Sequence, residues 1–262
     1  MRKTLLALVV LVLATTVTFA SSITLYPTSP EVASSSTVGA PGNSAPGFGT
    51  GSVANNGSTT KSEIYIPVGD LFTGSVTIRD VASISYWTNK PGSAGDPDWS
   101  FYIYTNPTGS GDEASWYHSR LVSEPYFTGT PSVAADTWHE WSTNDPSNPM
   151  RFYDSGRDGG IFGTYSDPTL AAIHSGAISW PSGSTYDYNS DAIEFFSFQT
   201  GSAWTNGFTG MLDGLTVTLN DGRTGTVNFE ASPAAVPEPG SIVLLGTGLA
   251  GLAGTLRRKF GR

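Results

Sequence analysis

The chain has 262 residues, a formal net charge of −9, no cysteine and 13% charged residues, while aromatic side chains make up 12% of it. The lack of cysteine excludes disulfides, a thiol nucleophile and thiolate metal ligands. The acidic charge argues against binding to nucleic acid or to an anionic membrane surface, and the Gly-, Ser- and aromatic-rich composition is typical of an extracellular β-protein.

The first 20 residues are a predicted signal peptide. Arg2 and Lys3 form a basic start, an apolar stretch runs over residues 5–14, and Ala20 ends a candidate cleavage site. The apolar stretch is short and polar threonines follow it, which favours secretion over a permanent N-terminal anchor. We therefore expect the mature chain to begin at Ser21 and the protein to be exported.

Residues 21–60 are rich in Ser, Gly, Pro and Asn. Such a composition predicts a flexible leader or a loosely structured entry that lies over the following domain. From residue 63 onwards, short β-like runs alternate with turn residues, so we predict a β-sandwich domain over residues 61–231. The exported part, residues 21–236, has about three times as many acidic as basic side chains.

Alternation is clearest at residues 99–104. Trp99, Phe101 and Ile103 fall on one face of a predicted strand, and Tyr102 and Tyr104 fall on the other. Because successive side chains of a strand point to opposite sides of the sheet, the first face is predicted to be buried.

The strongest hairpin signal lies between residues 215 and 230, where two alternating runs flank the turn sequence Asn220-Asp221-Gly222. One helix is predicted at residues 170–174, with Ser166 and Asp167 as its cap and Pro168 in its first turn. About a dozen short strands and one short helix predict an all-β fold, a two-sheet antiparallel β-sandwich of jelly-roll type. The predicted strands cover residues 63–68, 75–79, 81–88, 99–105, 115–122, 137–141, 150–153, 177–180, 192–200, 208–212, 215–219 and 224–230.

No motif indicates catalysis. His118, His139 and His174 do not have the spacing of a zinc or catalytic site, and the chain contains no Gly-x-Ser-x-Gly sequence. A glycoside hydrolase needs two carboxylates across a cleft, and no compact acidic motif selects such a pair. We therefore expect a protein that is not an enzyme.

Calcium is the candidate cofactor, because it prefers oxygen ligands in loops. Asp96 and Asp98 lie in one such loop, and further acidic pairs occur at residues 112–113 and 154–158. Residues 208–215 also resemble the closing strands of jelly-roll carbohydrate-binding modules, and this resemblance implies a structural calcium at Asp213. A turn aspartate is the alternative explanation for that residue.

Aromatic side chains suggest a second type of site. Sugars stack their apolar C–H faces on aromatic rings, so Tyr102, Tyr104, Trp116 and Tyr117 are candidate ligand-binding residues. A large sandwich without cysteine also needs bulky core side chains, so most of the seven tryptophans are expected to be buried.

The C-terminal region, residues 232–262, has three parts. Pro237, Glu238 and Pro239 form a rigid extended triplet, an apolar run of 15 residues spans 242–256, and Arg257-Arg258-Lys259 follows. As a helix the apolar run is about 22 Å long against roughly 30 Å of hydrocarbon, and the cations are placed to remain on the cytoplasmic side. We predict a transmembrane helix over residues 242–256.

This arrangement resembles the PEP-CTERM sorting signal of exported proteins in exopolysaccharide-producing Gram-negative bacteria. The resemblance implies that an exosortase and the secretion machinery are partners, and that the chain is anchored transiently in the inner membrane before it reaches the cell envelope or the exterior. We expect a structural or binding role linked to exopolysaccharide in a biofilm matrix. The alternatives are a carbohydrate-binding module and, less favoured, a secreted glycoside hydrolase.

Overall fold

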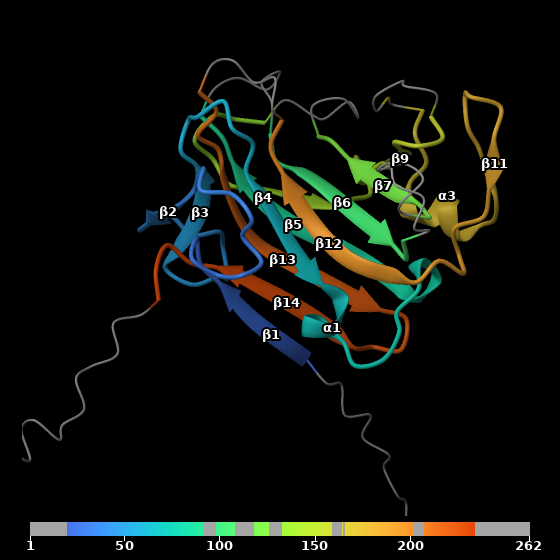
Figure 1. Ribbon diagram of the computed structural model, residues 1–262, viewed down its shortest axis with the longest axis horizontal. Coiled ribbons are helices and arrows are strands. Elements are labelled where there is room, and N and C mark those ends of the chain that lie inside the picture. The colour runs from blue at the N-terminus through green and yellow to red at the C-terminus, as the bar shows by residue number, and fades with distance from the viewer. Residues whose placement is uncertain are drawn as a thin grey trace, which may run out of the picture. The chain divides into compact units, whose positions relative to one another are not determined.

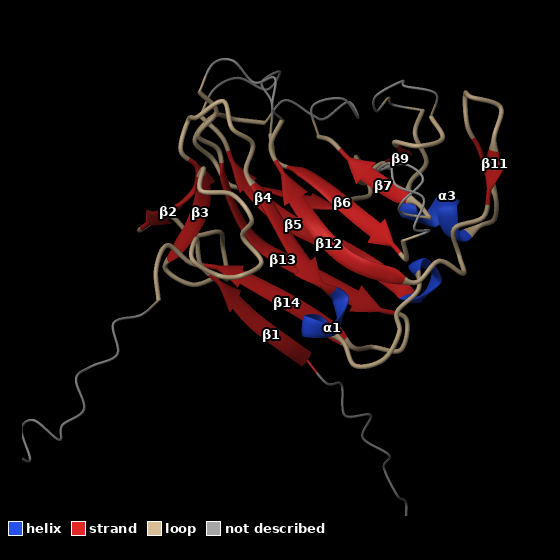
Figure 2. Cartoon of the chain, in the orientation of Figure 1, coloured by secondary structure: helices blue, strands red, loops and turns tan. Residues whose placement is uncertain are grey.

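The computed structural model describes residues 20–91, 98–107, 118–125, 133–158, 164, 166–201 and 207–233. The chain divides after Ala231 into two units, and the second, residues 232–262, includes only two described residues. The first unit is mostly β-structure, with two main sheets and few short helical segments among its described residues (Figures 1 and 2).

The larger sheet has seven strands and contains both the first and the last strand of the body. Its main order is β1-β14-β13-β3-β2, and β5 pairs with both β13 and β8. β1 runs parallel to β14, whereas the other pairs are antiparallel. Its strands are β1 (Ala20–Leu25), β2 (Thr37–Pro41), β3 (Gly51–Asn55), β5 (Val81–Asn89), β8 (His139–Ser142), β13 (Met211–Leu219) and β14 (Thr224–Phe229).

The smaller sheet has five antiparallel strands in the order β4-β12-β6-β7-β9. A separate two-stranded hairpin, β10 (Ile178–Ser179) and β11 (Thr185–Tyr186), follows helix α3 (Leu170–His174). A short helix α1 (Val68–Leu71) and a 3-10 turn at Ile78–Asp80 lie between β4 and β5. The five strands are β4 (Glu63–Pro67), β6 (Ser100–Thr105), β7 (Arg120–Ser123), β9 (Tyr153–Asp154) and β12 (Ile193–Gln199).

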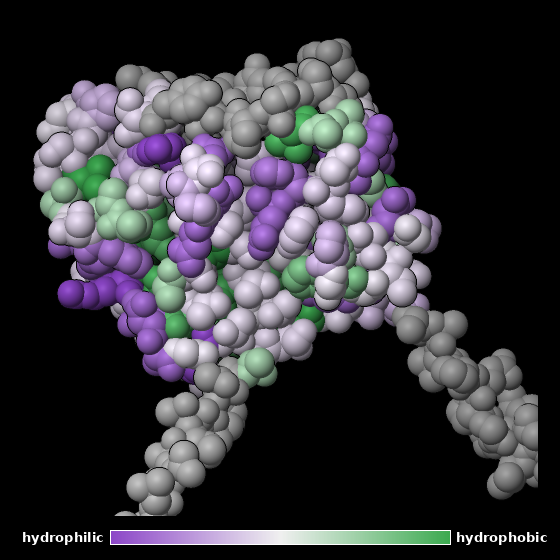
Figure 3. Space-filling view, turned by 180° about the vertical axis from the view of Figure 1, so that it is seen from behind, coloured by the Kyte–Doolittle hydropathy of each residue, from purple (hydrophilic) through white to green (hydrophobic). Residues whose placement is uncertain are grey.

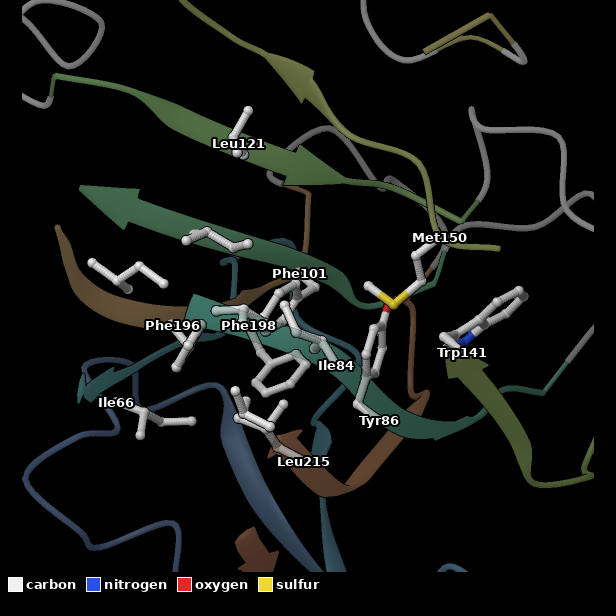
Figure 4. Close-up of a cluster of buried hydrophobic side chains, with 14 of the residues drawn as sticks. Ile66, Ile84, Tyr86, Phe101, Leu121, Trp141, Met150, Phe196, Phe198 and Leu215 are labelled. Carbon is white, nitrogen blue, oxygen red and sulfur yellow. The ribbon is translucent and has the colours of Figure 1, made fainter. Parts of the chain in front are cut away.

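The hydrophobic core lies between the two sheets (Figure 4). Phe198 of β12 packs its ring against Tyr86 of β5 at 5.1 Å, and against Phe229 of β14 at 5.8 Å between centroids. These rings belong to opposite sheets, so the sheets pack face to face as a sandwich. Each buried aromatic side chain of this kind contributes about 1.5–3 kcal/mol.

Several predicted elements are confirmed. Phe101 and Ile103 are fully buried, as the alternation in β6 predicts. The predicted hairpin at 215–230 joins β13 to β14, and Gly222 takes a φ of +89° in its turn. Helix α3 covers the predicted residues, but its cap is the side chain of Thr169, which accepts the backbone N–H of Ala172.

Other elements differ from the prediction. Residues 21–60, expected to precede the sandwich, supply β2, β3 and nearly all of β1. Residues 78 and 79 of the predicted strand 75–79 belong to a 3-10 turn. The end of the predicted strand 208–212 and the whole of the predicted strand 215–219 form one long strand, β13. These N-terminal strands are short and rich in Ser, Gly and Ala, so their pairing depends on β13 and β14 rather than on local propensity.

Most of the visible surface is polar or weakly apolar, with green patches of limited size (Figure 3). Among the described residues, Val38 on β2 is the one large hydrophobic side chain in the exposed class, at 38%.

Candidate functional site

The outer side of the five-stranded sheet carries a set of aromatic rings. Alternate residues of each strand point away from the core, and the register places Tyr65, Ser197, Tyr102, Val122 and Tyr153 in one row across five strands. We call the outward rings the aromatic face. It consists of Tyr65, Tyr102, Tyr104, Tyr153 and Phe195.

Four of these rings contact one another. Tyr102 and Tyr104 are stacked, with centroids 5.9 Å apart and planes 19° apart. Phe195 lies 5.0 Å from Tyr104 and 5.7 Å from Tyr65. Tyr65, Tyr102 and Phe195 are half-buried, whereas Tyr104 is only 4% exposed. The outer side of this sheet is therefore partly apolar, unlike the polar outer side that a solvent-facing sheet usually has.

Polar groups surround one edge of the aromatic face. The amide of Gln199 donates to the Tyr104 hydroxyl at 3.0 Å and to Ser197 Oγ at 3.2 Å. Tyr65 donates its hydroxyl proton to Glu63 Oε1, which also forms an ion pair with Lys61 at 2.7 Å. Both amide protons of the buried Gln199 are therefore used within the protein, whereas the carboxylate of Glu63 and the ammonium group of Lys61 are suitable partners for hydroxyl groups of a ligand.

The opposite edge holds a half-buried carboxyl group, that of Glu124. Tyr153 donates to Glu124 Oε1 at 2.8 Å, and the guanidinium carbon of Arg120 lies 6.0 Å from the Tyr104 ring centroid. Burial raises the pKa of Glu124, and the hydrogen bond from Tyr153 opposes this shift. Burial also raises the pKa of Tyr102 and Tyr153, so both phenols remain protonated donors at neutral pH.

A second polar cluster joins β7, β9 and the β10–β11 hairpin. Asp154 is almost fully buried, and it accepts hydrogen bonds from Tyr188 at 2.8 Å and from Arg157. The guanidinium carbon of Arg157 lies 3.9 Å from the centroid of the Tyr186 ring. Arg157 therefore connects Asp154 of β9 to Tyr186 of the hairpin.

The same cluster contains a histidine–aspartate pair. His118 Nδ1 lies 3.0 Å from Asp191 Oδ1, and Tyr186 donates its hydroxyl to the same oxygen at 3.0 Å. The hydroxyl of Ser119 donates to Asp191 Oδ2. Burial and Asp191 raise the pKa of Tyr186 to about 12. Because Ser119 bonds the carboxylate and not the imidazole, these groups do not have the serine–histidine contact of a hydrolase triad.

The candidate calcium ligand Asp213 is fully buried in β13. Its Oδ2 accepts the N–H of Ala45 at 2.9 Å, and its Oδ1 accepts the N–H of Gly214 at 2.8 Å and of Phe229 at 3.1 Å. Burial raises the pKa of Asp213 to about 6, although these hydrogen bonds lower it. Both oxygens therefore face backbone donors, and the side chain joins three segments of the larger sheet.

Asp98 has a comparable environment. Its Oδ2 accepts the Thr88 hydroxyl at 2.7 Å and its Oδ1 accepts the N–H of Trp99 at 2.8 Å. Trp141 in turn donates its indole N–H to Thr88 Oγ1 at 2.7 Å. Burial raises the pKa of Asp98 to about 6. Asp96 lies outside the described residues, and within them no three His, Asp or Glu side chains are grouped as metal ligands would be.

The structure brings together two of the four predicted ligand-binding residues, Tyr102 and Tyr104, on the aromatic face. Trp116 and Tyr117 lie outside the described residues. Tyr65, Tyr153 and Phe195 were not predicted to join them. The alternation within β4 and β12 indicates that Tyr65 and Phe195 share the outward side of their strands, but only the strand order places them beside Tyr104.

Comparison with known families identifies the C-terminal region. The model of the PEP-CTERM protein-sorting motif matches residues 235–259, which include Pro237, Glu238, Pro239 and the basic cluster at 257–259. The motif implies an exported protein that an exosortase sorts and processes. Searches of the curated proteins and of the solved structures return no match to the chain.

The predicted signal peptide and the predicted transmembrane helix at 242–256 fall on residues outside those described, apart from Ala20. In the described part of the chain, no helix has the length and apolarity needed to cross a bilayer.

Proposed function

We propose that the body of this exported protein binds the polysaccharide of the extracellular matrix through its aromatic face, in a structural or binding role without catalysis. The observation that supports the proposal is the contiguity of Tyr65, Tyr102, Tyr104 and Phe195 beside the polar edge at Gln199 and Glu63. Aromatic surface with a few placed polar groups is the usual composition of a small-molecule or sugar site.

The charges on this face also matter. The charges of Lys61 and Glu63 neutralise each other, and the neighbouring Gln199 is polar but uncharged. The polar side chains along this edge of the aromatic face therefore carry no net charge. The body is strongly acidic, so it repels polyanions at long range. We therefore propose that the ligand is a neutral polysaccharide, whose hydroxyl groups bond to the Glu63 carboxylate and the Lys61 ammonium group while its C–H faces stack on the rings.

The test is binding of the mature protein to matrix polysaccharide by pull-down and calorimetry. Replacing Tyr102 by alanine removes one half-buried ring and its stacking on Tyr104. We expect affinity to fall about two- to twelve-fold, which corresponds to the 0.5–1.5 kcal/mol of one aromatic contact. Tyr102→Phe keeps the ring and removes only the hydroxyl, so its change in affinity measures the contribution of the hydroxyl group alone.

Tyr26→Ala is the matched control, because Tyr26 is also half-buried but directly follows β1 of the other sheet. Equal loss of binding in Tyr26→Ala and Tyr102→Ala, or no binding of any neutral polysaccharide by the unaltered protein, would contradict the proposal.

A further inference from the structure

The residues that follow β14 pass close to three glycines of the β2–β3 hairpin, which we call the glycine track. A Cβ atom added at Gly39 would lie 2.7 Å from the Cα of Ala231, and one at Gly49 would lie 2.6 Å from Cδ of Glu230. At Gly51 the added atom would lie 3.0 Å from the backbone nitrogen of Ala231. The backbone of Ala231 therefore fits closely against Gly39 and Gly51, and the side chain of Glu230 fits closely against Gly49, because these three hairpin positions lack side chains.

Hydrogen bonds hold the same residues in place. Glu230 Oε1 accepts the N–H of Thr50 at 2.9 Å, and the N–H of Glu230 donates to the carbonyl of Leu25 at 2.8 Å. Just upstream, Asn228 Oδ1 accepts the N–H of Gly49 at 3.2 Å. In these contacts and hydrogen bonds, the partners of positions 228–231 all lie between residues 25 and 51. The composition of this region suggests a loose leader. We call this arrangement the exit clamp.

The exit clamp ends close to the sorting motif in sequence. Ala231 is its last residue, and the matched motif begins at residue 235, so three residues separate them. Three fully extended residues span at most about 10 Å. If residues 230–231 were released, five residues would intervene and would span at most about 17 Å.

We infer that the exit clamp is a positioning device for exosortase processing, which limits how far the sorting motif can extend from the folded body. The glycine track and Glu230 are its positioning residues. A peptidase that engages the motif must approach within this short distance of the sandwich, so the clamp slows processing of the folded protein. Release of the clamp, or any lengthening of the connection, gives the peptidase more room.

The experiment follows the full chain in cells that produce the exosortase, with the half-time of conversion to the processed mass as readout. Gly39→Ala places a methyl group against the backbone of Ala231, and we expect it to shorten the half-time at least about two-fold, since tethered reactions depend steeply on whether the tether can span the gap. Insertion of Gly-Ser between Pro233 and Ala234 leaves the body unaltered and lengthens the connection directly, so it should have the same effect.

Gly69→Ala is the control, because a Cβ at Gly69 meets no atom within 4 Å. Hydrogen exchange of the Glu230 amide reports clamp opening independently and should become faster in Gly39→Ala. Unchanged processing after the Gly-Ser insertion overturns the proposal, and so does unchanged exchange at Glu230 in a Gly39→Ala protein that is processed faster. Neither result depends on polysaccharide binding.

Discussion

Replacing Asp98 by asparagine removes a buried ionisable group while keeping its shape. Asp98 is 2% exposed, and burial raises the pKa of its carboxyl group from 3.8 to about 6 in the folded protein. The folded state therefore binds this proton more tightly than the unfolded chain does. The resulting stabilisation is fully present below the unfolded pKa of 3.8 and is lost as the pH rises through about 6.

A shift of about two pKa units corresponds to about 3 kcal/mol over the full range, and about 1 kcal/mol of it appears between pH 7 and pH 5. Asp213, with a pKa also raised to about 6, adds a similar amount. Together the two carboxyl groups should contribute about 2–3 kcal/mol more stability at pH 5 than at pH 7, which on its own raises the melting temperature by roughly 5–10 °C. Burial lowers the pKa of His139, and this shift offsets part of the gain over the same pH range.

The assay is urea unfolding of residues 20–231 at pH 7 and pH 5, with chelator and with added calcium. Asp98→Asn should reduce the gain in unfolding free energy by about 1 kcal/mol, because one of the two titrating groups is gone. A calcium ion bound by Asp98 would favour the ionised carboxylate and reverse the sign of the pH dependence. Lower stability at pH 5 than at pH 7, or a calcium-dependent midpoint, would refute the reasoning.

Three further substitutions test the packing and the polar clusters. Phe198→Ala should destabilise the body by about 3–5 kcal/mol, measured by urea unfolding, because the ring is fully buried between the sheets. Arg157→Ala should cost about 3 kcal/mol or more, since it leaves the buried Asp154 without its cation, and Asp154→Asn in the same background should recover part of the loss. Gly214→Ala should cost about 2 kcal/mol or more, because Gly214 has a φ of +65° and an added Cβ would lie 2.6 Å from Cδ2 of the Phe48 ring. A melting temperature equal to that of the unaltered protein would contradict this.

The alternation and turn signals predicted much of the sandwich. β6 and the β13–β14 hairpin have strong apolar periodicity, so their burial follows from local residues alone. β1, β2 and β3 have no such pattern in their sequences, because they contain few large apolar side chains. Their strand character comes from hydrogen bonds to strands far away in the sequence, which local composition does not encode.

The candidate site shows the same division. Tyr102 and Tyr104 are outward residues of one strand and can be predicted together, but Tyr65 and Phe195 reach them only through the strand order β4-β12-β6. Asp213 was a candidate calcium ligand in sequence, whereas three backbone N–H groups from separate segments occupy its oxygens. Which atoms surround a buried carboxylate depends on long-range packing.

The sequence by itself identified the sorting motif, because such a motif is one contiguous stretch of residues. Only the tertiary structure decided which aromatic rings form a common face and which glycines hold the chain before the motif. Both features join residues more than 90 positions apart, such as Tyr104 with Phe195 and Gly39 with Ala231. Such contacts exist only after strands far apart in the sequence have paired within a sheet.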